Sequence, residues 1–594
     1  MIRHLVAGAC CCLLASACSS DNNPNPDAGP PLPFIVDPLR ADAGCDWMQW
    51  GQNWAHTGAT CAPAQSLDRS LDQVVFDPFV DLEIAEAEGL FQREGLFAHY
   101  AAPLVQGDDA YIAVKAGSYE PCTPPGSRTP DGCGFDGWAN QVWTVQHHVW
   151  NGGVLELQGT FESDWKPPAW QVVSAWEPVF QHAITQNAVY VPGAGGTLWK
   201  LDRSLGSPQQ IDPLAPFNAN RYVTGPVVVD ADGTVFYNVI ELAPLNPLSN
   251  DAVGYLVKVS PTGQTSFRQY SDLVSGGPSA ASQCPYSFAA GNISPPWPAT
   301  VPVPTGPCGS QRPGWNSAPA IGPGGVLFVV SRAHFTGQDS WLTALNTDLS
   351  TRWSFHLSQI LNDGCGVLMP SNAVSATDPT CRVGAPVGVD RNTGLKPTAI
   401  VSDQASSVPV ALPDGAVIYG SFTAYNTARG HLIKVSPTGT LMAMFDFGWD
   451  VSPAVWIRNN TYSIITKDNH YFSWTSDNEG PFNISQLDRN LKVEWSYTSS
   501  QTQSCVTLPD GGVSCVTDHP SGFEWCINAP AVAPDGTVYG NSEDGRVYAI
   551  RQGGTLYQDR FLLQSLEAAY TPITVDSQGR VYSLNGGVMT VVGH

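Results

Sequence analysis

The sequence is dominated by an internal repeat of short apolar strands and tight turns. Its clearest copy is NAPAVAPDGTVYGNSEDGRVYAI, residues 528–550. Each Asp-Gly pair lies between alternating apolar residues, where glycine accepts the positive φ that a tight hairpin turn requires. Eight copies can be traced along the chain, and each begins at a proline: Pro103, Pro178, Pro226, Pro319, Pro409, Pro453, Pro530 and Pro572, of which the copies at Pro103, Pro178 and Pro453 are weaker.

Each unit continues into a third and a fourth strand joined by a polar turn, as in LWKLDRSLG at 198–206 and LIKVSPTG at 432–439. Four antiparallel strands form one blade, and blades repeated around an axis form a propeller. The sequence therefore predicts an all-β fold, an eight-bladed β-propeller of four-stranded antiparallel blades.

The two ends of the chain supply complementary parts of one repeat. Residues 66–81, SLDRSLDQVVFDPFVD, match the turn and outer strand of the unit, whereas the C-terminus stops at a third strand, GVMTVVGH. We expect the N-terminal strand to complete the last blade, because this pairing removes exposed strand edges.

Composition agrees with a turn-rich β protein that does not bind nucleic acid. Of the 594 residues only 13% are charged, while glycine (57) and proline (49) are abundant. The formal net charge of -24 would repel nucleic-acid phosphates. We expect residues 41–594 to form a single propeller domain with disulfide-bearing loop insertions.

The N-terminus has the features of an export signal. Arg3 precedes an apolar run, residues 5–17, that is too short to span a bilayer, so residues 1–17 are interpreted as a signal peptide. The sequence LASAC ending at Cys18 resembles the lipobox of bacterial lipoproteins, which implies lipidation of Cys18. An ordinary cleaved signal is the alternative. Residues 18–40 then form the lipidated cysteine and a flexible tether.

By the same resemblance, Ser19 directly after Cys18 favours the outer membrane over the inner one, since retained lipoproteins usually carry Asp there. The lipid would be the only membrane attachment. Whether the protein lies on the periplasmic or the outer side of that membrane stays open.

The remaining cysteines fall in Gly/Pro-rich segments, with no C-x-x-C and no histidine at zinc spacing. In an exported protein this pattern predicts disulfides. Neighbour pairing is the simplest connectivity, and it leaves Cys526 over: Cys45 with Cys61, Cys122 with Cys133, Cys284 with Cys308, Cys365 with Cys381, and Cys505 with Cys515.

The repeat resembles the one found in pyrroloquinoline-quinone (PQQ) enzymes, whose pattern runs Pro-Ala-Val, Asp-Gly, a Val-Tyr strand and a Leu-Tyr-Ala-Leu strand. The resemblance covers residues 101–594. It implies a quinoprotein-like propeller, and that repeat serves both quinone enzymes and non-catalytic scaffolds.

Loop lengths separate the two faces of the expected ring. The turns after strands one and three lie on one face, here called the Asp-Gly face. Four long insertions fall on the opposite face, here called the loop face: residues 116–140, 274–316, 357–407 and 499–528. Binding residues concentrate in loops on a rigid scaffold, so we expect function on the loop face.

The residues just before each first strand, here called lead-in residues, should surround the channel mouth on the loop face. They pair aromatic side chains with oxygen-bearing ones: Trp176 with Glu177, Trp315 with Asn316, Trp449 with Asp450, Trp525 with Asn528, and Tyr570. One interpretation is tryptophan packing between blades with polar turn caps. The other is a ring suited to a hard cation or a sugar.

Quinone enzymes of this fold hold calcium with a Glu, an Asn and an Asp near the channel, which Glu177, Asn316 and Asp450 match by residue type. The mature chain lacks the vicinal cysteines of such alcohol dehydrogenases, and it has no C-x-x-C-H haem site, G-x-S-x-G elbow, H-E-x-x-H or P-loop.

We therefore expect a non-catalytic, monomeric envelope lipoprotein that binds a protein or saccharide partner through one capped face. Its nearest functional analogue is the propeller lipoprotein of the outer-membrane β-barrel assembly machinery. The alternative is a PQQ- and calcium-dependent oxidoreductase acting on alcohols or sugars. No cofactor is assigned; calcium stays open and PQQ is not expected.

Overall fold

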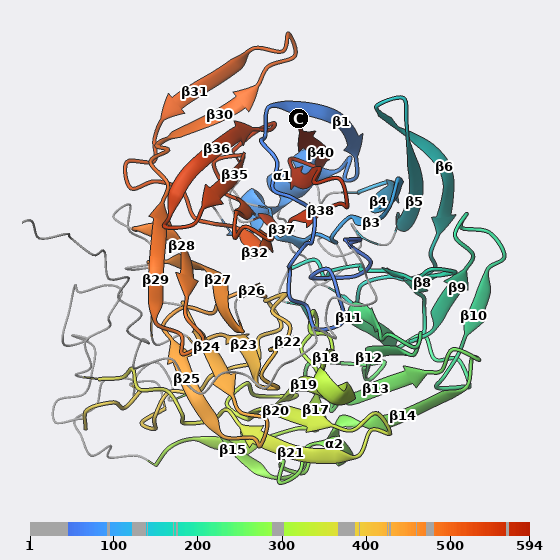
Figure 1. Cartoon of the computed structure of the whole chain (residues 1–594). Helices are drawn as coiled ribbons and strands as arrows, with labels where there is room; N and C mark the ends of the chain where they lie inside the picture. The colour runs from blue at the N-terminus through green and yellow to red at the C-terminus, as the bar shows by residue number, and fades with distance from the viewer. Residues whose placement is uncertain are drawn as a thin grey trace, which may run out of the picture.

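The computed structural model shows eight sheets arranged around a central axis (Figure 1). The predicted signal peptide, Cys18 and the tether lie outside the residues that it describes. The described residues are 45–91, 96–120, 138, 140–169, 172–173, 176–287, 302–365, 386–390, 393–423, 426, 429–458, 460–470, 480–565 and 569–594.

The first four blades follow one another along the chain. Their strands are β3 (Leu104–Gln106), β4 (Asp109–Gly117), β5 (Gln141–Asn151) and β6 (Val154–Glu162); β7 (Ala183–Ile184), β8 (Val189–Pro192), β9 (Leu198–Leu201) and β10 (Gln209–Ile211); β11 (Arg221–Val229), β12 (Val235–Glu241), β13 (Val253–Val259) and β14 (Thr265–Gln269); and β18 (Ala320–Gly322), β19 (Val326–Ala333), β20 (Ser340–Leu345) and β21 (Thr351–His356), with β17 (Gln311–Arg312) also paired to β19.

The other four blades repeat the pattern. Their strands are β22 (Val410–Ala411), β23 (Val417–Ser421), β24 (His431–Val435) and β25 (Leu441–Phe445); β26 (Ala454–Arg458), β27 (Thr461–Asn469), β28 (Phe482–Leu487) and β29 (Val493–Thr498); β33 (Ala531–Val532), β34 (Val538–Asn541), β35 (Arg546–Arg551) and β36 (Thr555–Phe561); and β38 (Thr574–Val575), β39 (Val581–Asn585), β40 (Val588–Gly593) and β1 (Arg69–Val75). The predicted eight-bladed, four-stranded architecture is confirmed.

The last blade is closed by the N-terminal strand, as the sequence predicts. β1 pairs antiparallel with β40, from Arg69 opposite Gly593 to Val75 opposite Val588. Figure 1 shows the C-terminus beside β1. Because the two ends of the chain share one sheet, unzipping the ring requires breaking this pairing first.

In the part of the chain that the structure describes, the few helical segments lie outside the blades. They are α1 (Val80–Phe91), α2 (Tyr270–Leu273) and the 3-10 turn η2 (Pro323–Gly325). Within the described residues, no helix is long and apolar enough to cross a membrane.

Burial falls from the axis outward in each blade. The second strands β8 and β23 are buried at every position, whereas the outer strand β36 is exposed or half-buried throughout. The tight turns use glycine at positive φ, as at Gly536 (φ 83°) between β33 and β34. The apolar core therefore lies between neighbouring blades and along their inner strands.

Residues 46–60, here called the channel loop, make one circuit of the inner strands. Backbone and glutamine hydrogen bonds join it to seven blades in chain order: Trp47 to Val105, Met48 to Ile184, Gln49 to Val229, Trp54 to Ile321, Ala55 to Ala411, Thr57 to Val455, and Gly58 and Thr60 to Val532. The channel loop therefore occupies the inside of the ring, an element that the repeat pattern did not predict.

Candidate functional site

The channel loop seals the ring from the Asp-Gly face. A disulfide between Cys45 and Cys61 closes it. The backbone N–H of Gly107, in the turn between β3 and β4, donates to Asp46, which places the start of the loop at the Asp-Gly face. Trp47 and Trp50 are fully buried inside. The sequence signal was present: three tryptophans lie between two cysteines at 45–61.

At the opposite, loop-face end of the channel, the lead-in segments lie side by side. β2 (Ala98–His99), β37 (Ala569–Pro572) and β32 (Ile527–Ala529) form a parallel three-stranded sheet. Glu177 extends it through a parallel bridge to Ala98. The lead-in segments of blades seven, eight, one and two are thus held together by backbone pairing.

His99 links the predicted site residues. Its Nε2 lies 3.1 Å from Oδ2 of Asp450. Its Nδ1 lies 3.3 Å from the backbone oxygen of Glu177 and 3.5 Å from Nδ2 of Asn316. All four residues are buried. The structure therefore brings Glu177, Asn316 and Asp450 into one network through a histidine that the sequence analysis did not select.

Ser406 extends the network to Asn528. Its backbone N–H and its hydroxyl both donate to Oδ1 of Asp450, each at 2.6 Å, and Nδ2 of Asn528 donates to its Oγ at 2.9 Å. His99 and Ser406 stand four and three residues before the first-strand prolines Pro103 and Pro409. Applying the lead-in rule to every blade would have found both.

The carboxylate of Glu177 is neutralised by a buried lysine. Lys115 Nζ lies 2.5 Å from Glu177, 2.8 Å from Asp77 and 2.8 Å from Glu83. Burial raises the pKa of Glu177 despite the opposing attraction of Lys115. Burial likewise raises the pKa of Glu83 to about 8, against the charge of Lys115. One cation from blade one therefore holds three carboxyl groups, from the segment after β1, from α1 and from the lead-in of blade two.

Asp450 is ionised by its surroundings. Burial alone would raise its pKa, but His99, the charge of Lys467 and the Ser406 hydroxyl outweigh burial and lower it. Lys467 Nζ also lies 4.7 Å from the centre of the Tyr570 ring. Asp450 is thus a charged acceptor whose partners all belong to the protein.

The aromatic lead-in residues divide into two groups. Trp176 and Tyr570 lie against the His99 ring, at centroid distances of 5.1 Å and 5.4 Å. Trp525 instead contacts Tyr548 at 4.9 Å and donates to the backbone of Phe482, so it packs between blades six and seven.

The other two tryptophans also pack against neighbouring rings. Trp315 contacts Tyr222 at 6.0 Å, and Trp449 contacts Phe422 at 4.8 Å. Trp315, Trp449 and Trp525 therefore pack against aromatic neighbours, as the first interpretation expects, whereas Trp176 and Tyr570 pack against the His99 ring.

The described residues around His99 and Glu177 do not fit calcium or PQQ. A cavity of about 30 Å³ adjoins His99, Lys115 and Glu177, enough for about one or two water molecules and far below the roughly 300 Å³ of a small-ligand pocket. The two carboxylates are already paired with Lys115 and His99. A cation at Glu177 would have to displace a buried lysine, and the cavity beside His99 is too small for a tricyclic quinone.

A second group of possible metal ligands lies near Lys467. Glu524, Cys526 and Glu543 place their ligand atoms within 4.8 Å of one another. Cys526 is the predicted leftover thiol, buried and unbridged, and burial raises its pKa. The charge of Lys467 acts on all three, so a protein cation already balances this group.

The disulfides follow the predicted neighbour pairing where it can be seen. Cys45–Cys61, Cys284–Cys308 and Cys505–Cys515 are bonded. Cys365 is also disulfide-bonded, whereas Cys122, Cys133 and Cys381 lie outside the described residues. The first of these bonds belongs to the channel loop, and the next two belong to loop-face insertions.

Two hairpins carry the loop-face disulfides. β15 (Gln283–Pro285) pairs with β16 (Thr305–Pro307), and β30 (Gln503–Thr507) pairs with β31 (Val513–Thr517). Cys505 lies directly opposite Cys515 in the second pair. Figure 1 shows β30 and β31 beyond β36 at the rim of the ring.

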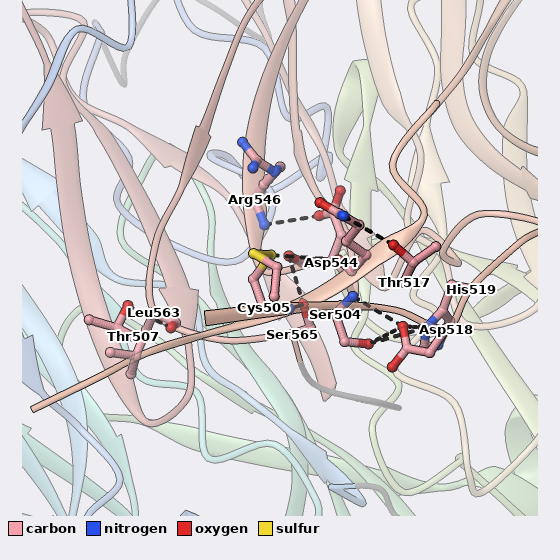
Figure 2. The surroundings of a disulfide bond; sticks show 12 residues. Ser504, Cys505, Thr507, Thr517, Asp518, His519, Asp544, Arg546, Leu563 and Ser565 are labelled. Carbon is pink, nitrogen blue, oxygen red and sulfur yellow. Dashed lines mark hydrogen bonds and ion pairs between the residues drawn. A yellow bond between two sulfur atoms is a disulfide. The ribbon is translucent and has the colours of Figure 1, made fainter. Parts of the chain in front are cut away.

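The inner strand of the β30–β31 hairpin is fixed to blade seven. Cys505 exchanges hydrogen bonds with Ser565, and Thr507 bonds to the backbone of Leu563 through both its N–H and its hydroxyl. Figure 2 shows these contacts and the Ser504–Asp518–His519 group at the base of the hairpin. The disulfide and these bonds hold β30 in place and leave β31 outermost.

The fold and the mouth together define a class: an eight-bladed propeller whose channel is closed by its own N-terminal loop. No protein-family model matches the chain, and no curated protein matches it. Among solved structures, a europium-containing methanol dehydrogenase is similar, with 11% identity over 92% of this chain and 90% of that chain and a TM-score of 0.47.

Two further solved structures are similar in the same way. Quinohemoprotein alcohol dehydrogenase from Comamonas testosteroni is 12% identical over 93% of this chain and 82% of that one, with a TM-score of 0.46. BamB from Moraxella catarrhalis is 14% identical over 69% and 82%, with a TM-score of 0.33. At these identities the likeness concerns architecture alone.

Proposed function

We propose that the protein is a non-catalytic lipoprotein of the bacterial envelope that binds an extended segment of a partner protein along β31. The single observation behind this proposal is the outer edge of the β30–β31 hairpin. Within the described residues no strand pairs with that edge. An unpaired strand edge offers backbone donors and acceptors to an incoming strand.

The composition of β31 favours pairing with an incoming strand over protection of the unpaired edge. Natural edge strands are usually blunted by lysine, proline or bulges. β31 reads VSCVT, contains none of these, and is exposed at every position. Val513 and Val516 are 54% and 62% exposed, and Val506 and Leu508 on the partner side add two more exposed apolar side chains. Backbone pairing with apolar side-chain contacts is the chemistry of β-strand addition.

A second copy of the chain is a poor occupant for this edge. The protein carries a formal net charge of -24, so two copies repel each other over most of their surface. The hairpin itself ends in Asp510 and Asp518. We therefore assign the edge to a different protein, with a strand that carries apolar and basic residues.

The position of the channel loop supports an orientation on the membrane. Cys45 and Asp46 lie at the Asp-Gly face, and Gln65 bonds to Gln578 in the turn between β38 and β39 on the same face. A lipid on Cys18 would thus tether the protein by its Asp-Gly face. The loop face, with β31, then points away from the outer membrane.

Site-specific photocross-linking tests the binding proposal. A photoreactive side chain at Val516 is compared with one at Val493, which is 53% exposed on the outer strand of blade six. We expect Val516 to form one discrete protein adduct in intact envelopes, and the substitution Val513→Lys to abolish it. Equal adducts from both positions, or none from Val516, would refute the proposal.

Membrane attachment is tested separately. We expect the Cys18→Ala variant to leave the membrane fraction, while a Cys45→Ser, Cys61→Ser double variant stays there. Unchanged membrane association of Cys18→Ala with a free N-terminus on the mature chain would show that the lipid anchor is wrong.

A further inference from the structure

A hollow on the loop face lies between blades three, four and five, next to the lead-in of blade five. It measures about 650 Å³, within the range of small-molecule pockets. Its walls come from the β12–β13 turn, the β15–β16 hairpin, the end of β19 and the lead-in of blade five. We propose that this pocket binds a carboxylate-bearing sugar, a site separate from the β31 edge and independent of the proposed function.

Charge makes the pocket an exception in this protein. Its charged lining residues are Arg312, Arg332 and Asp403, a net charge of +1 in a chain whose formal net charge is -24. Arg312 binds Asp403 through both terminal nitrogens, at 2.8 Å and 2.7 Å. Burial opposes ionisation of Asp403, but Arg312 and Arg332 outweigh it and lower its pKa to about 2. The pocket keeps this charge throughout the neutral pH range.

The guanidinium nitrogens of Arg312 donate to other groups of the protein. Its Nε donates to Nδ1 of His334 at 3.0 Å, and Nε2 of His334 faces the Pro247 oxygen at 3.0 Å. This chain of bonds requires a neutral imidazole, and burial together with Arg312 lowers the pKa of His334 to about 4. Arg312 thus serves to fix the wall and the aspartate.

Arg332 is the cation that faces a ligand. Its side chain is 16% exposed against 4% for Arg312. It donates Nη1 to Asp403 and Nε to the backbone of Ala333, and no described residue accepts a bond from Nη2. The Nη2 of a positioned guanidinium can donate a charge-assisted hydrogen bond to a carboxylate.

The rest of the lining suits a sugar ring. Tyr286 and Phe335 present aromatic rings, and Ser249, Ser402 and Gln404 present hydroxyl and amide groups at the rim. The Cys284–Cys308 disulfide, two residues from Tyr286, holds that wall. Phe335 is fixed by a backbone bond to Cys308. The volume of the pocket far exceeds that of an inorganic anion. In a small-molecule pocket the apolar walls supply contact area, and a few polar groups set the orientation of the ligand.

Titration calorimetry on the mature, disulfide-intact chain tests this proposal, with galacturonic acid, glucuronic acid, galactose and acetate as probes. We expect a uronic acid to bind at least about tenfold more tightly than galactose or acetate, since each of these supplies only half of the contacts. Binding of acetate or galactose as tight as that of both uronic acids would overturn the proposal.

Variants locate the binding. Arg332→Gln should weaken uronic-acid binding about tenfold or more, because a charge-assisted bond is lost while Arg312 still holds Asp403. Ser249→Trp, on an exposed turn, should block the opening without touching the core. Arg352→Gln, on the outer strand of blade four, is the control and should bind normally. Unchanged binding in Arg332→Gln, or no heat from either uronic acid with the parent, refutes the assignment.

Discussion

Lys115 Nζ lies 2.5 Å from Oε2 of Glu177, and the same ammonium group contacts Asp77 and Glu83. These four side chains come from four segments: blade one, the lead-in of blade two, the segment after β1, and α1. The cluster therefore joins the closing strand of the ring to the channel mouth. Its stability depends on a single cation.

Replacing that cation should destabilise the ring closure. In Lys115→Met, three buried carboxyl groups lose their partner, and breaking a buried pair costs about 3–5 kcal/mol. At about 2.1 cal/mol/K per residue of unfolding entropy, this corresponds to a fall in Tm of about 2–4 °C. Differential scanning calorimetry measures it. Lys200→Met, on β9, is the control and should shift Tm by less than about 0.5 °C; equal shifts would contradict the assigned role.

Glu83 makes the same cluster sensitive to pH. Its pKa of about 8 in the folded protein lies above the ordinary value of 4.5. Between these pH values the folded state holds the proton more tightly than the unfolded chain, so the free energy of unfolding falls as the pH rises across this window. Tm should therefore fall from about pH 5 to pH 8 more steeply in the parent than in Glu83→Gln. Parallel curves for the two proteins would count against this account, and Glu156→Gln, an exposed change on β6, should follow the parent.

The Cys45–Cys61 disulfide should matter to the whole ring, and the Cys505–Cys515 disulfide only to its hairpin. Both close short loops, for which chain entropy predicts about 3 kcal/mol. The channel loop bonds to seven blades, so losing its constraint should lower the global Tm by about 2–3 °C. The hairpin contacts mainly residues 563–565 and can open locally.

Serine substitutions at each pair, followed by calorimetry and limited proteolysis, separate the two effects. The Cys505→Ser, Cys515→Ser variant should keep the parent Tm and gain a cleavage site between residues 503 and 517. A large fall in Tm from the hairpin variant, or none from the channel-loop variant, would mean that the roles are reversed.

The repeat predicted the blades, the ring closure and the face that carries the insertions, because turn chemistry and strand alternation are local and recur eight times. The channel loop escaped prediction since it occurs once and its partners, such as Val105 and Val532, are far away in the chain. His99 escaped because no tryptophan lies beside it to mark the lead-in before Pro103. The pairing of Glu177 with Lys115 could not be derived, since Lys115 sits mid-strand in β4 with nothing in the sequence to mark it as inward-facing.

The last prediction concerns calcium binding at the channel mouth. The sequence left calcium binding open, and the contacts of Glu177 and Asp450 oppose it. Two carboxylates that lacked partners would repel each other, and a divalent cation would relieve that repulsion. Here Glu177 binds Lys115 and Asp450 binds His99, so that repulsion is already relieved. We expect millimolar calcium, with or without PQQ, to leave the Tm of the parent unchanged and to support no dye reduction with alcohols or sugars.

The substitutions Glu177→Gln and Asp450→Asn make this test specific. Each removes a buried carboxylate whose partner, Lys115 or His99, remains, so each should lower Tm by itself, by an amount set by a charge-assisted hydrogen bond of about 1.5–3 kcal/mol. Neither should change the response to calcium, because there is no response to lose. A calcium-dependent rise in Tm that both substitutions abolish would require the lysine and histidine to yield to a cation, and it would restore the quinone-enzyme alternative over the binding protein.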